Sequence, residues 1–324
     1  MREITFGEAV REALREEMTK DETVFIYGMD IGVGFPSGLT KGLREEFGAD
    51  RVRDTPICEQ TVVGITVGAA LMGMRAVPEI QFSDLLTLCM DQIVNQAAKL
   101  RYMSGGQITL PITIRTAAGF SGSNGAQHSQ SLESWFMHVP GLKVVIPSTP
   151  ADAKGLLKSS IRDDNPVLFL EHKMLNRTKG AVPEGDVVIP LGKADIKRPG
   201  KDITLVTFSH MVHRSLTAAE TLEKDGIDVE VIDLRTLAPL DEETLLRSIR
   251  KTHRLVVLEE GCKTGGVGAE ISAIVAEEAM DEMDAPIRRV AAYDTPIPFS
   301  PPLEKYVIPD ERRIESVIRE TLNL

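Results

Sequence analysis

The chain has 324 residues, of which 42% are hydrophobic, and a formal net charge of -11 at pH 7. This length predicts about two domains, and the hydrophobic fraction is sufficient for ordinary cores. The acidic charge argues against binding to nucleic acid or to an anionic membrane surface. No apolar run reaches the roughly 18 residues that span a bilayer, and the N-terminus lacks the layout of a signal peptide. Cys58, Cys89 and Cys262 are too few and too widely separated to indicate a disulfide framework or a zinc site. We therefore expect a cytoplasmic protein.

Short apolar runs alternate with helical segments in the first half of the chain. Thr5-Phe6-Gly7-Glu8 has the spacing of a capping box and predicts a helix that continues to about Met18. The segment from Ser83 to Met103 is long and amphipathic, and Thr149-Pro150-Ala151-Asp152 has the residues of a strong helix start. Strands are predicted over 24–28, 76–80, 111–115, 142–146 and 167–170. This alternation indicates an α/β fold with a mostly parallel sheet.

A second α/β unit follows a stretch in which the periodicity fades into proline and glycine, between about Lys179 and Asp202. We predict one domain over 1–180, a linker over 181–201, and a smaller domain over 202–324 that is wound the same way. Its strands are predicted over 203–208, 229–233, 255–259 and 287–291, and its helices over 212–224, 242–250 and 267–280. Four prolines between Pro296 and Pro302 predict an extended segment before a final helix.

The stretch Asp54-Thr55-Pro56-Ile57-Cys58-Glu59-Gln60 places one carboxylate at the entrance to an apolar helix predicted over 60–74. The positive end of the helix dipole favours the ionised form of Glu59, whereas packing under an apolar wall favours the protonated form. A carboxylate under both influences can share a proton with a basic heterocycle, which is a catalytic role. The alternative is that Glu59 is an ordinary acidic residue at a helix start.

A second candidate is His128, which lies in the Gly- and Ser-rich loop 120–129. Loops on a rigid sheet often carry catalytic side chains, and a histidine there titrates near neutral pH and can exchange protons with a reacting group. The alternative is a histidine that is hydrogen-bonded for structure alone. His138 fits a structural role, and His210 and His213 fit surface or interface positions.

Several sequence blocks occur in one order along nearly the whole chain. They include Asp54-Thr55-Pro56-Ile57-x-Glu59, Gly64-Ile65-x-Val67-Gly68-Ala69-Ala70, Tyr102-Met103-Ser104-Gly105-Gly106, Gln127-His128-Ser129-Gln130 and Asp233-Leu234-Arg235-Thr236-Leu237. In these blocks the chain resembles the β subunit of thiamine-diphosphate-dependent 2-oxo acid dehydrogenases, a group that includes pyruvate, branched-chain and acetoin dehydrogenases and is related to transketolase. The resemblance implies a transketolase-like pyrimidine domain followed by a transketolase C-terminal-like domain, both doubly wound.

The resemblance also implies roles for single residues. In that family, the glutamate matching Glu59 hydrogen-bonds a ring nitrogen of the cofactor and favours the imino tautomer that removes the thiazolium proton. Ile57, Gln81 and Leu85 match positions that contact the cofactor. Many relatives have Phe or Tyr where this chain has Leu85, which offers apolar contact without ring stacking. The histidine matching His128 lines the mouth of the site and assists transfer to the lipoyl group.

Part of the cofactor site is missing from this chain, since it contains no Gly-Asp-Gly, the family's motif for diphosphate and magnesium. The resemblance implies that a separate α subunit supplies that half, in an α2β2 heterotetramer whose active site lies between subunits. It also implies a lipoyl-bearing acyltransferase core as a partner.

A structural potassium site is a further expectation. Relatives coordinate this ion mostly through carbonyl oxygens, which suit a hard cation at a helix end. The alternative is an ordinary turn, because Asp163-Asp164-Asn165-Pro166 is strong turn chemistry without any ion. The matching positions are Ile112, Ser160, Ile161, Asp163 and Asn165.

The sequence therefore predicts a dehydrogenase β subunit that decarboxylates a 2-oxo acid, or cleaves acetoin, and transfers the acyl group to a lipoyl domain. The segments 85–93 and 262–266 look slightly more like acetoin-type relatives. Two alternatives are a split transketolase-like half that acts on sugar phosphates and a non-catalytic assembly subunit.

Overall fold

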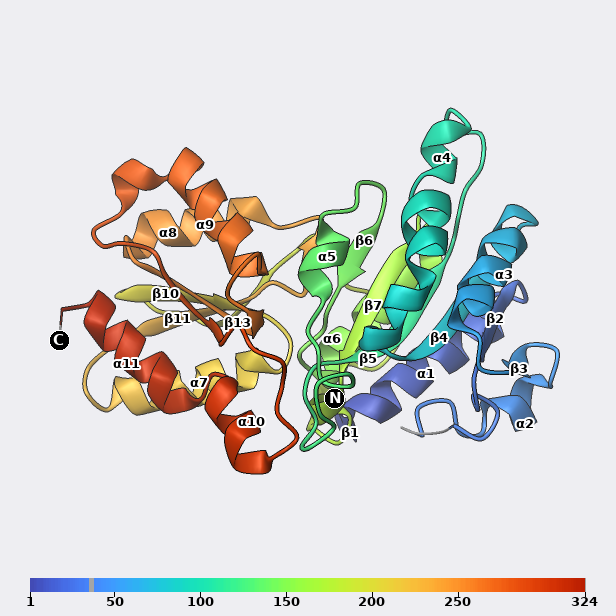
Figure 1. Ribbon diagram of the computed structural model, residues 1–324, viewed down its shortest axis with the longest axis horizontal. Helices are drawn as coiled ribbons and strands as arrows, with labels where there is room; N and C mark the ends of the chain where they lie inside the picture. The colour runs from blue at the N-terminus through green and yellow to red at the C-terminus, as the bar shows by residue number, and fades with distance from the viewer. Residues whose placement is uncertain (35–37, 324) are drawn as a thin grey trace. The chain divides into compact units, whose positions relative to one another are not determined.

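The computed structural model describes residues 1–34 and 38–323, and it divides into two compact units (Figure 1). The first unit comprises Met1–Ala118 with Trp135–Leu191, and the second comprises Gly119–Ser134 with Gly192–Leu324. Each unit is built on its own mostly parallel sheet, which confirms the α/β prediction. The linker over 181–201 stays a prediction.

A parallel sheet forms the centre of the first unit. Its strands hydrogen-bond in the order β6-β7-β5-β4-β2-β3. Every residue of β2 and of β7 is buried, as expected for parallel strands covered on both faces. The strands are β2 (Val24–Gly28), β3 (Val52–Asp54), β4 (Arg75–Phe82), β5 (Thr113–Ala118), β6 (Lys143–Val145) and β7 (Val167–His172).

The predicted helix starts are confirmed by their caps. Thr5 caps α1 (Phe6–Lys20): its hydroxyl accepts from the Glu8 N–H at 3.2 Å, and the Glu8 carboxylate accepts from the Thr5 N–H at 2.7 Å. In the same way, Thr149 caps α6 (Pro150–Arg162), and Pro150 lies at its first position. Each cap satisfies backbone donors that have no partner within the helix.

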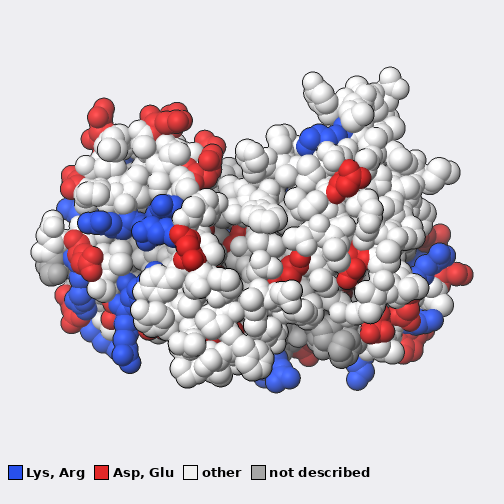
Figure 2. Space-filling model, viewed as in Figure 1, with Lys and Arg blue, Asp and Glu red and all other residues white. Residues whose placement is uncertain are grey.

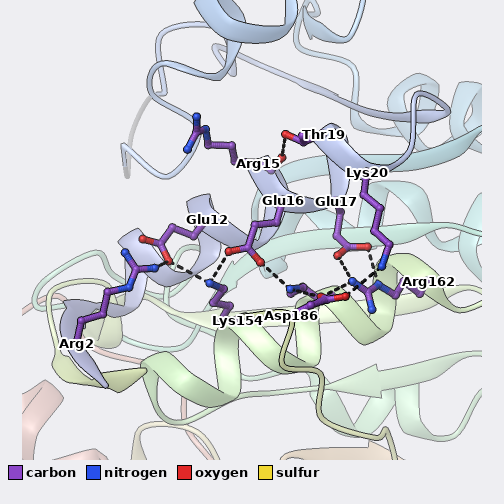
Figure 3. Close-up of polar contacts among 11 residues, drawn as sticks. Arg2, Glu12, Arg15, Glu16, Glu17, Thr19, Lys20, Lys154, Arg162 and Asp186 are labelled. Atoms are coloured by element: carbon purple, nitrogen blue, oxygen red, sulfur yellow. Dashed lines mark hydrogen bonds and ion pairs between the residues drawn. The ribbon is translucent and has the colours of Figure 1, made fainter. Parts of the chain in front are cut away.

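Ion pairs join α1 to α6 (Figure 3). The buried Lys158 ammonium lies 2.6 Å from Glu16 and 2.5 Å from Asp186. Arg162 lies 2.6 Å from Glu17 and 2.6 Å from the same Asp186. Hydrogen bonds from Arg162 and Lys158 hold the pKa of Asp186 well below its usual range. Asp186 also lies 3.0 Å from Lys20 of α1, so it ties its loop to both helices.

The segment Ser83–Met103 is helical as predicted but is not one α-helix. It consists of a 3₁₀ turn η1 (Ser83–Cys89), a π-helical stretch η2 (Asp91–Ala97) and the short α4 (Leu100–Met103). An apolar pattern over so few residues does not distinguish these helix types, so the sequence could not have separated them. The unit also contains β1 (Arg2–Thr5), α2 (Leu43–Phe47), α3 (Glu59–Leu71), η3 (Lys173–Leu175) and β8 (Lys179–Val182). β1 pairs antiparallel with β8.

The second unit has a sheet in the order β14-β13-β10-β11-β9. β10, β11, β13 and β14 are parallel, whereas β9 is antiparallel to β11. The chain leaves β10 for β11 on one side and then returns to β13 on the other, so the strand order reverses beside β10. The strands are β9 (Asp195–Arg198), β10 (Ile203–Thr207), β11 (Val229–Asp233), β12 (Thr236–Ala238), β13 (Leu255–Cys262) and β14 (Arg288–Ala292).

Helices of the second unit match the predicted ranges except near the C-terminus. Pro301 and Pro302, which were expected in an extended segment, instead occupy the first turn of a helix, a position where proline's missing N–H has no consequence. No helix among residues 1–34 and 38–323 is both long and apolar enough to cross a membrane. The helices are α7 (Met211–Glu223), α8 (Glu242–Thr252), α9 (Val267–Glu278), η4 (Met280–Glu282), α10 (Pro301–Val307) and α11 (Glu311–Thr321). One more helix, α5 (Glu133–Met137), begins in the second unit and ends in the first.

Candidate active site

A small cleft in the first unit lies at the carboxyl ends of β2, β3 and β4, beside the start of α3. Ligands of open α/β sheets bind at this edge. The Thr55 N–H donates to the Gly28 carbonyl at 3.0 Å, which holds the turn between β3 and α3 against the end of β2. The cleft is lined by Met29, Thr55, Pro56, Ile57, Cys58, Glu59, Val62, Glu79, Ile80 and Gln81. The structure thus brings together three of the predicted cofactor-site residues, Ile57, Glu59 and Gln81.

Glu59 lies in the first turn of α3, and the preceding residue, Cys58, makes no side-chain capping hydrogen bond. The first N–H groups of the helix therefore have no side-chain cap from that position. The Cys58 thiol instead contacts the Thr61 hydroxyl at 2.9 Å, a hydrogen bond that lowers the pKa of the thiol. The helix start is left open toward the cleft.

Two polar atoms in the cleft test whether the heterocycle predicted from the sequence fits this site. Gln81 Nε2 and Thr55 Oγ1 are buried, and neither has a hydrogen-bond partner within the described part of the chain. Buried polar groups normally have partners, so these two fit a ligand that carries hydrogen-bonding nitrogens. Beside them, the Ile57 side chain is 72% exposed. The cleft itself has a volume of about 20 Å³, enough for about one water molecule, so this chain supplies one wall of such a site.

Leu85 does not line this cleft, although the resemblance places it on the cofactor. It lies half-buried in η1, directly after β4. Its contact with the pyrimidine ring stays a prediction.

A buried charge cluster beneath the cleft was not anticipated from the sequence. The Arg115 guanidinium, 1% exposed, donates to Glu171 at 2.7 and 3.1 Å and to Glu79 at 2.9 Å. These residues lie on the neighbouring strands β5, β7 and β4. Burial raises the pKa of Glu171, and the nearby Glu79 carboxylate adds to the increase, against the lowering effect of Arg115. Because Glu79 also lines the cleft, the cluster fixes part of its floor.

His128 lies on the segment Gly119–Ser134, here called the His128 loop, which packs with the second unit. The histidine itself is exposed. Next to it, a cavity of about 520 Å³ lies at the carboxyl ends of β13 and β14. The Ser129 hydroxyl faces this cavity, is almost fully buried and has no hydrogen-bond partner among the described residues.

Acidic residues that were not predicted as site residues from the sequence gather near the base of the His128 loop. Burial raises the pKa of Glu133 to about 8, with smaller contributions from the charges of Glu260 and Glu259. Burial also raises the pKa of Glu259 to about 7, although its carboxylate accepts a hydrogen bond from the Gly268 N–H. The pair Glu259-Glu260 at the end of a predicted strand was the available signal.

Four of the five predicted potassium ligands lie at the end of α6 and in the turn that follows it. The carbonyls of Ile161 and Asp163 each accept from the Arg75 guanidinium at 3.1 Å. The Asp163 carboxylate contacts Lys143 and accepts from the Asn165 N–H at 2.9 Å. In this structure, the Arg75 guanidinium and the Lys143 ammonium therefore bind oxygens that the predicted cation would use.

The fifth predicted ligand, Ile112, bonds through its carbonyl to the Val167 N–H at 2.8 Å, and Ser160 bonds through its carbonyl to the Asp163 N–H at 3.3 Å. Potassium at this turn stays a prediction.

Two further histidines and the three cysteines were also considered from the sequence. The His210 ring lies edge-on to Phe120 with 5.5 Å between ring centroids, at the start of the His128 loop. His138 is exposed. Cys58, Cys89 and Cys262 are free thiols.

Known proteins match both units of the chain. Residues 2–179 match the transketolase pyrimidine binding domain, and residues 192–314 match the transketolase C-terminal domain. The chain is 45% identical to the 2-oxoisovalerate dehydrogenase subunit beta of Bacillus subtilis, covering 98% of both chains. It is 47% identical to the acetoin:2,6-dichlorophenolindophenol oxidoreductase subunit beta of Cupriavidus necator, covering 99% of this chain and 98% of that one.

It is also 46% identical to the pyruvate dehydrogenase E1 component subunit beta of Bacillus subtilis, covering 99% of both. The chain belongs to this family of dehydrogenase β subunits. Its fold is shared with a solved split-gene transketolase, described as an inactive beta4 tetramer, with a TM-score of 0.83 at 24% identity over 99% of both chains. Membership of the transketolase-like family implies use of thiamine diphosphate, and the pyrimidine-domain match contains the Glu59 cleft.

Proposed function

We propose that the chain is the β subunit of a thiamine-diphosphate-dependent dehydrogenase that decarboxylates a 2-oxo acid or cleaves acetoin and passes the acyl group to a lipoyl domain. The observation that carries this proposal is the Glu59 cleft, where a carboxylate at a helix start lies beside Gln81 Nε2 and Thr55 Oγ1, two buried atoms that have no hydrogen-bond partner among the described residues. When bound, the cofactor supplies a carbanion that attacks the substrate carbonyl.

In this proposal, Glu59 holds a proton at a ring nitrogen of the pyrimidine. Gln81 Nε2 and Thr55 Oγ1 orient the ring by supplying the hydrogen bonds that the protein itself leaves unmade. Glu79 is held in the cleft wall by Arg115. The chain thus contributes proton handling and ring orientation.

We propose that an α subunit covers the cleft and brings the diphosphate site with magnesium, in an α2β2 assembly. The exposed side of α3 supports this: Ile65 is 53% exposed and Leu71 is 45% exposed, with Met72 at 84% just beyond the helix end. Figure 2 shows hardly any charged side chains over α3. Gly68 is also exposed on this helix, with space where a side chain would be, so another chain could approach closely. Large uncharged surfaces of this kind mark protein interfaces.

We further propose that His128 assists transfer to the lipoyl group of an acyltransferase core. Its exposure on a loop fits a residue that meets an incoming carrier. Cytoplasmic location and a structural potassium ion stay predictions alongside this proposal.

The test is a dye-reduction assay on the chain co-expressed with its α subunit, with thiamine diphosphate and magnesium. Acetoin, pyruvate and a branched-chain 2-oxo acid are offered in parallel. We expect a signal with at least one substrate that is lost by about 100-fold or more in Glu59→Gln. Glu45→Gln, which changes an exposed carboxylate in the first turn of α2, is the matched control and should retain full activity.

Absence of activity with all three substrates, from a well-formed heterotetramer, would contradict the proposal. Sugar phosphates would then be the next substrates to offer, and inactivity with these too would indicate an assembly subunit.

A further inference from the structure

The base of the His128 loop is closed by hydrogen bonds within the second unit. The Gly119 N–H donates to the Gln130 carbonyl at 3.2 Å, which joins the two ends of the loop. Phe120, next in sequence, is buried in the core of the second unit. Residues Ala126, Gln127 and His128 are exposed, so the loop has a fixed base and an exposed tip.

Glu260 binds both sides of this base. It lies at the carboxyl end of β13 and is 6% exposed. Its Oε1 accepts from the Phe120 N–H at 2.9 Å and from the Ser131 hydroxyl at 3.3 Å. A single carboxylate therefore joins the entry and exit of the loop, and hydrogen bonds to a charged acceptor are stronger than neutral ones.

Glu304 holds the middle of the loop. Ser123 has φ +66°, in the left-handed region that is unfavourable for any residue with a side chain. Its N–H lies 3.2 Å from each carboxylate oxygen of Glu304, which is buried in α10. Strained backbone persists only where the surroundings hold it, and Glu304 is the group that does so here.

Two glycines lie in the middle of the loop. Gly122 and Gly125, on either side of Ser123 and Asn124, have positive φ and tolerate many conformations. The carboxylates come from β13 and α10, elements far from the loop in sequence, and both are buried. They act on the loop that carries His128 without being adjacent to the histidine in sequence.

We propose that Glu260 and Glu304 are positioning residues that hold the His128 loop in the conformation that presents His128 for acyl transfer. This rests on the proposed function for the role of His128, although not for the anchoring itself. A merely structural role for the two carboxylates would lower stability without separating acyl transfer from the earlier steps.

The first test is hydrogen–deuterium exchange on the heterotetramer carrying Glu260→Ala or Glu304→Ala. Loss of a hydrogen bond to a charged acceptor should speed amide exchange by about 10- to 100-fold, at Phe120 in the first variant and at Ser123 in the second. Glu259→Gln is the matched control, because this buried neighbour accepts from the Gly268 N–H of α9 instead. It should leave the loop peptides unchanged.

The second test compares two acceptors. Transfer to a lipoyl domain should fall by about 10- to 100-fold in kcat in both alanine variants, with KM for the 2-oxo substrate unchanged. Dye reduction, which does not need the lipoyl group, should stay within about twofold. His128→Ala should lower transfer to the lipoyl domain by at least the same factor, and Ser123→Gly, which removes the left-handed strain, should restore part of the loss in Glu304→Ala.

The outcomes distinguish the anchoring of the loop from its role in positioning His128 for acyl transfer. Faster loop exchange with an unchanged ratio of lipoyl to dye activity would overturn the positioning role, and unchanged exchange would overturn the anchoring. An enzyme inactive with every substrate would defeat the proposed function, while the exchange data would still decide the anchoring. If the alanine variants fail to fold, Glu260→Gln and Glu304→Gln can replace them, because glutamine keeps an acceptor oxygen. The changes in amide exchange and in transfer to the lipoyl domain should then have the same direction but be smaller.

Discussion

Replacing Arg115 by Met removes the cation from the buried cluster with Glu79 and Glu171. Three hydrogen bonds at 2.7, 2.9 and 3.1 Å are lost, and two carboxylates remain in a site where the arginine is 1% exposed. Removing one partner of a buried ion pair costs about 3–5 kcal/mol. That is a large part of a typical free energy of unfolding.

The upper limit of this loss comes from protonation. Each of the two stranded carboxylates can take up a proton. For groups with an ordinary pKa near 4.5 this costs about 3.4 kcal/mol per group at pH 7 and about 0.7 kcal/mol per group at pH 5, so the limit for the pair is about 7 kcal/mol at pH 7 and about 1.4 kcal/mol at pH 5. The destabilisation by Arg115→Met should therefore shrink from about 3–5 kcal/mol at pH 7 to about 1–2 kcal/mol at pH 5.

Equilibrium urea unfolding, followed by circular dichroism at pH 5, 6 and 7, measures this directly. The triple variant Arg115→Met, Glu79→Gln, Glu171→Gln should recover most of the loss at pH 7 and show little dependence on pH. Arg53→Met removes an exposed arginine and should change stability by no more than about 0.5 kcal/mol. A loss by Arg115→Met that is equal at pH 5 and pH 7 would refute the reasoning, because stranded charge must respond to protons.

Three further predictions concern separate sites. Glu133, with its pKa raised to about 8, keeps a proton that the unfolded chain loses near pH 4.5, so stability should fall as pH rises between these values, by up to about 1.4 kcal/mol per pH unit. Glu133→Gln should remove that slope in melting temperatures measured from pH 5 to 9, and an unchanged slope would assign it to other groups. Gly141→Ala should destabilise by more than about 2 kcal/mol in urea, because the added carbon meets the Ala98 carbonyl oxygen at 2.0 Å. Gly105→Ala, also at positive φ but with open space, should lose only about 1 kcal/mol. If the turn at Asp163 binds potassium, the melting temperature should be higher in KCl than in choline chloride at equal ionic strength, and equal melting temperatures would refute the site.

Local sequence signals predicted local structure well. The caps at Thr5 and Thr149 depend on residues three positions away, and both were predicted and observed. The start of α3 was predicted within one residue, because the turn in the sequence directly precedes the apolar run of the helix. β9, in contrast, lies in the predicted linker, and its pairing with β11 depends on residues more than 30 positions away.

The candidate site shows the same contrast between features that depend on local sequence and features that depend on distant residues. Ile57, Glu59 and Gln81 share a cleft because strand ends of a parallel sheet lie at one edge, which the predicted parallel sheet implies. In the sequence alone, Arg115 is a single charged residue in a predicted strand. Only the register of β4, β5 and β7 shows that it lies between two glutamates. Glu260 contacts the His128 loop over a sequence separation of 140 residues, which no local pattern encodes.

Substrate choice does not follow from overall similarity to the known relatives. Relatives named for 2-oxoisovalerate, acetoin and pyruvate are all 45–47% identical to the chain, so overall identity does not favour one of them. The Glu59 cleft has room for about one water molecule, and the groups in it suit the cofactor rather than a substrate. In the proposed assembly, we expect the α subunit to supply much of the wall that meets the substrate. It follows that exchanging the α subunit should change the preferred substrate more than any single substitution in the cleft of this chain.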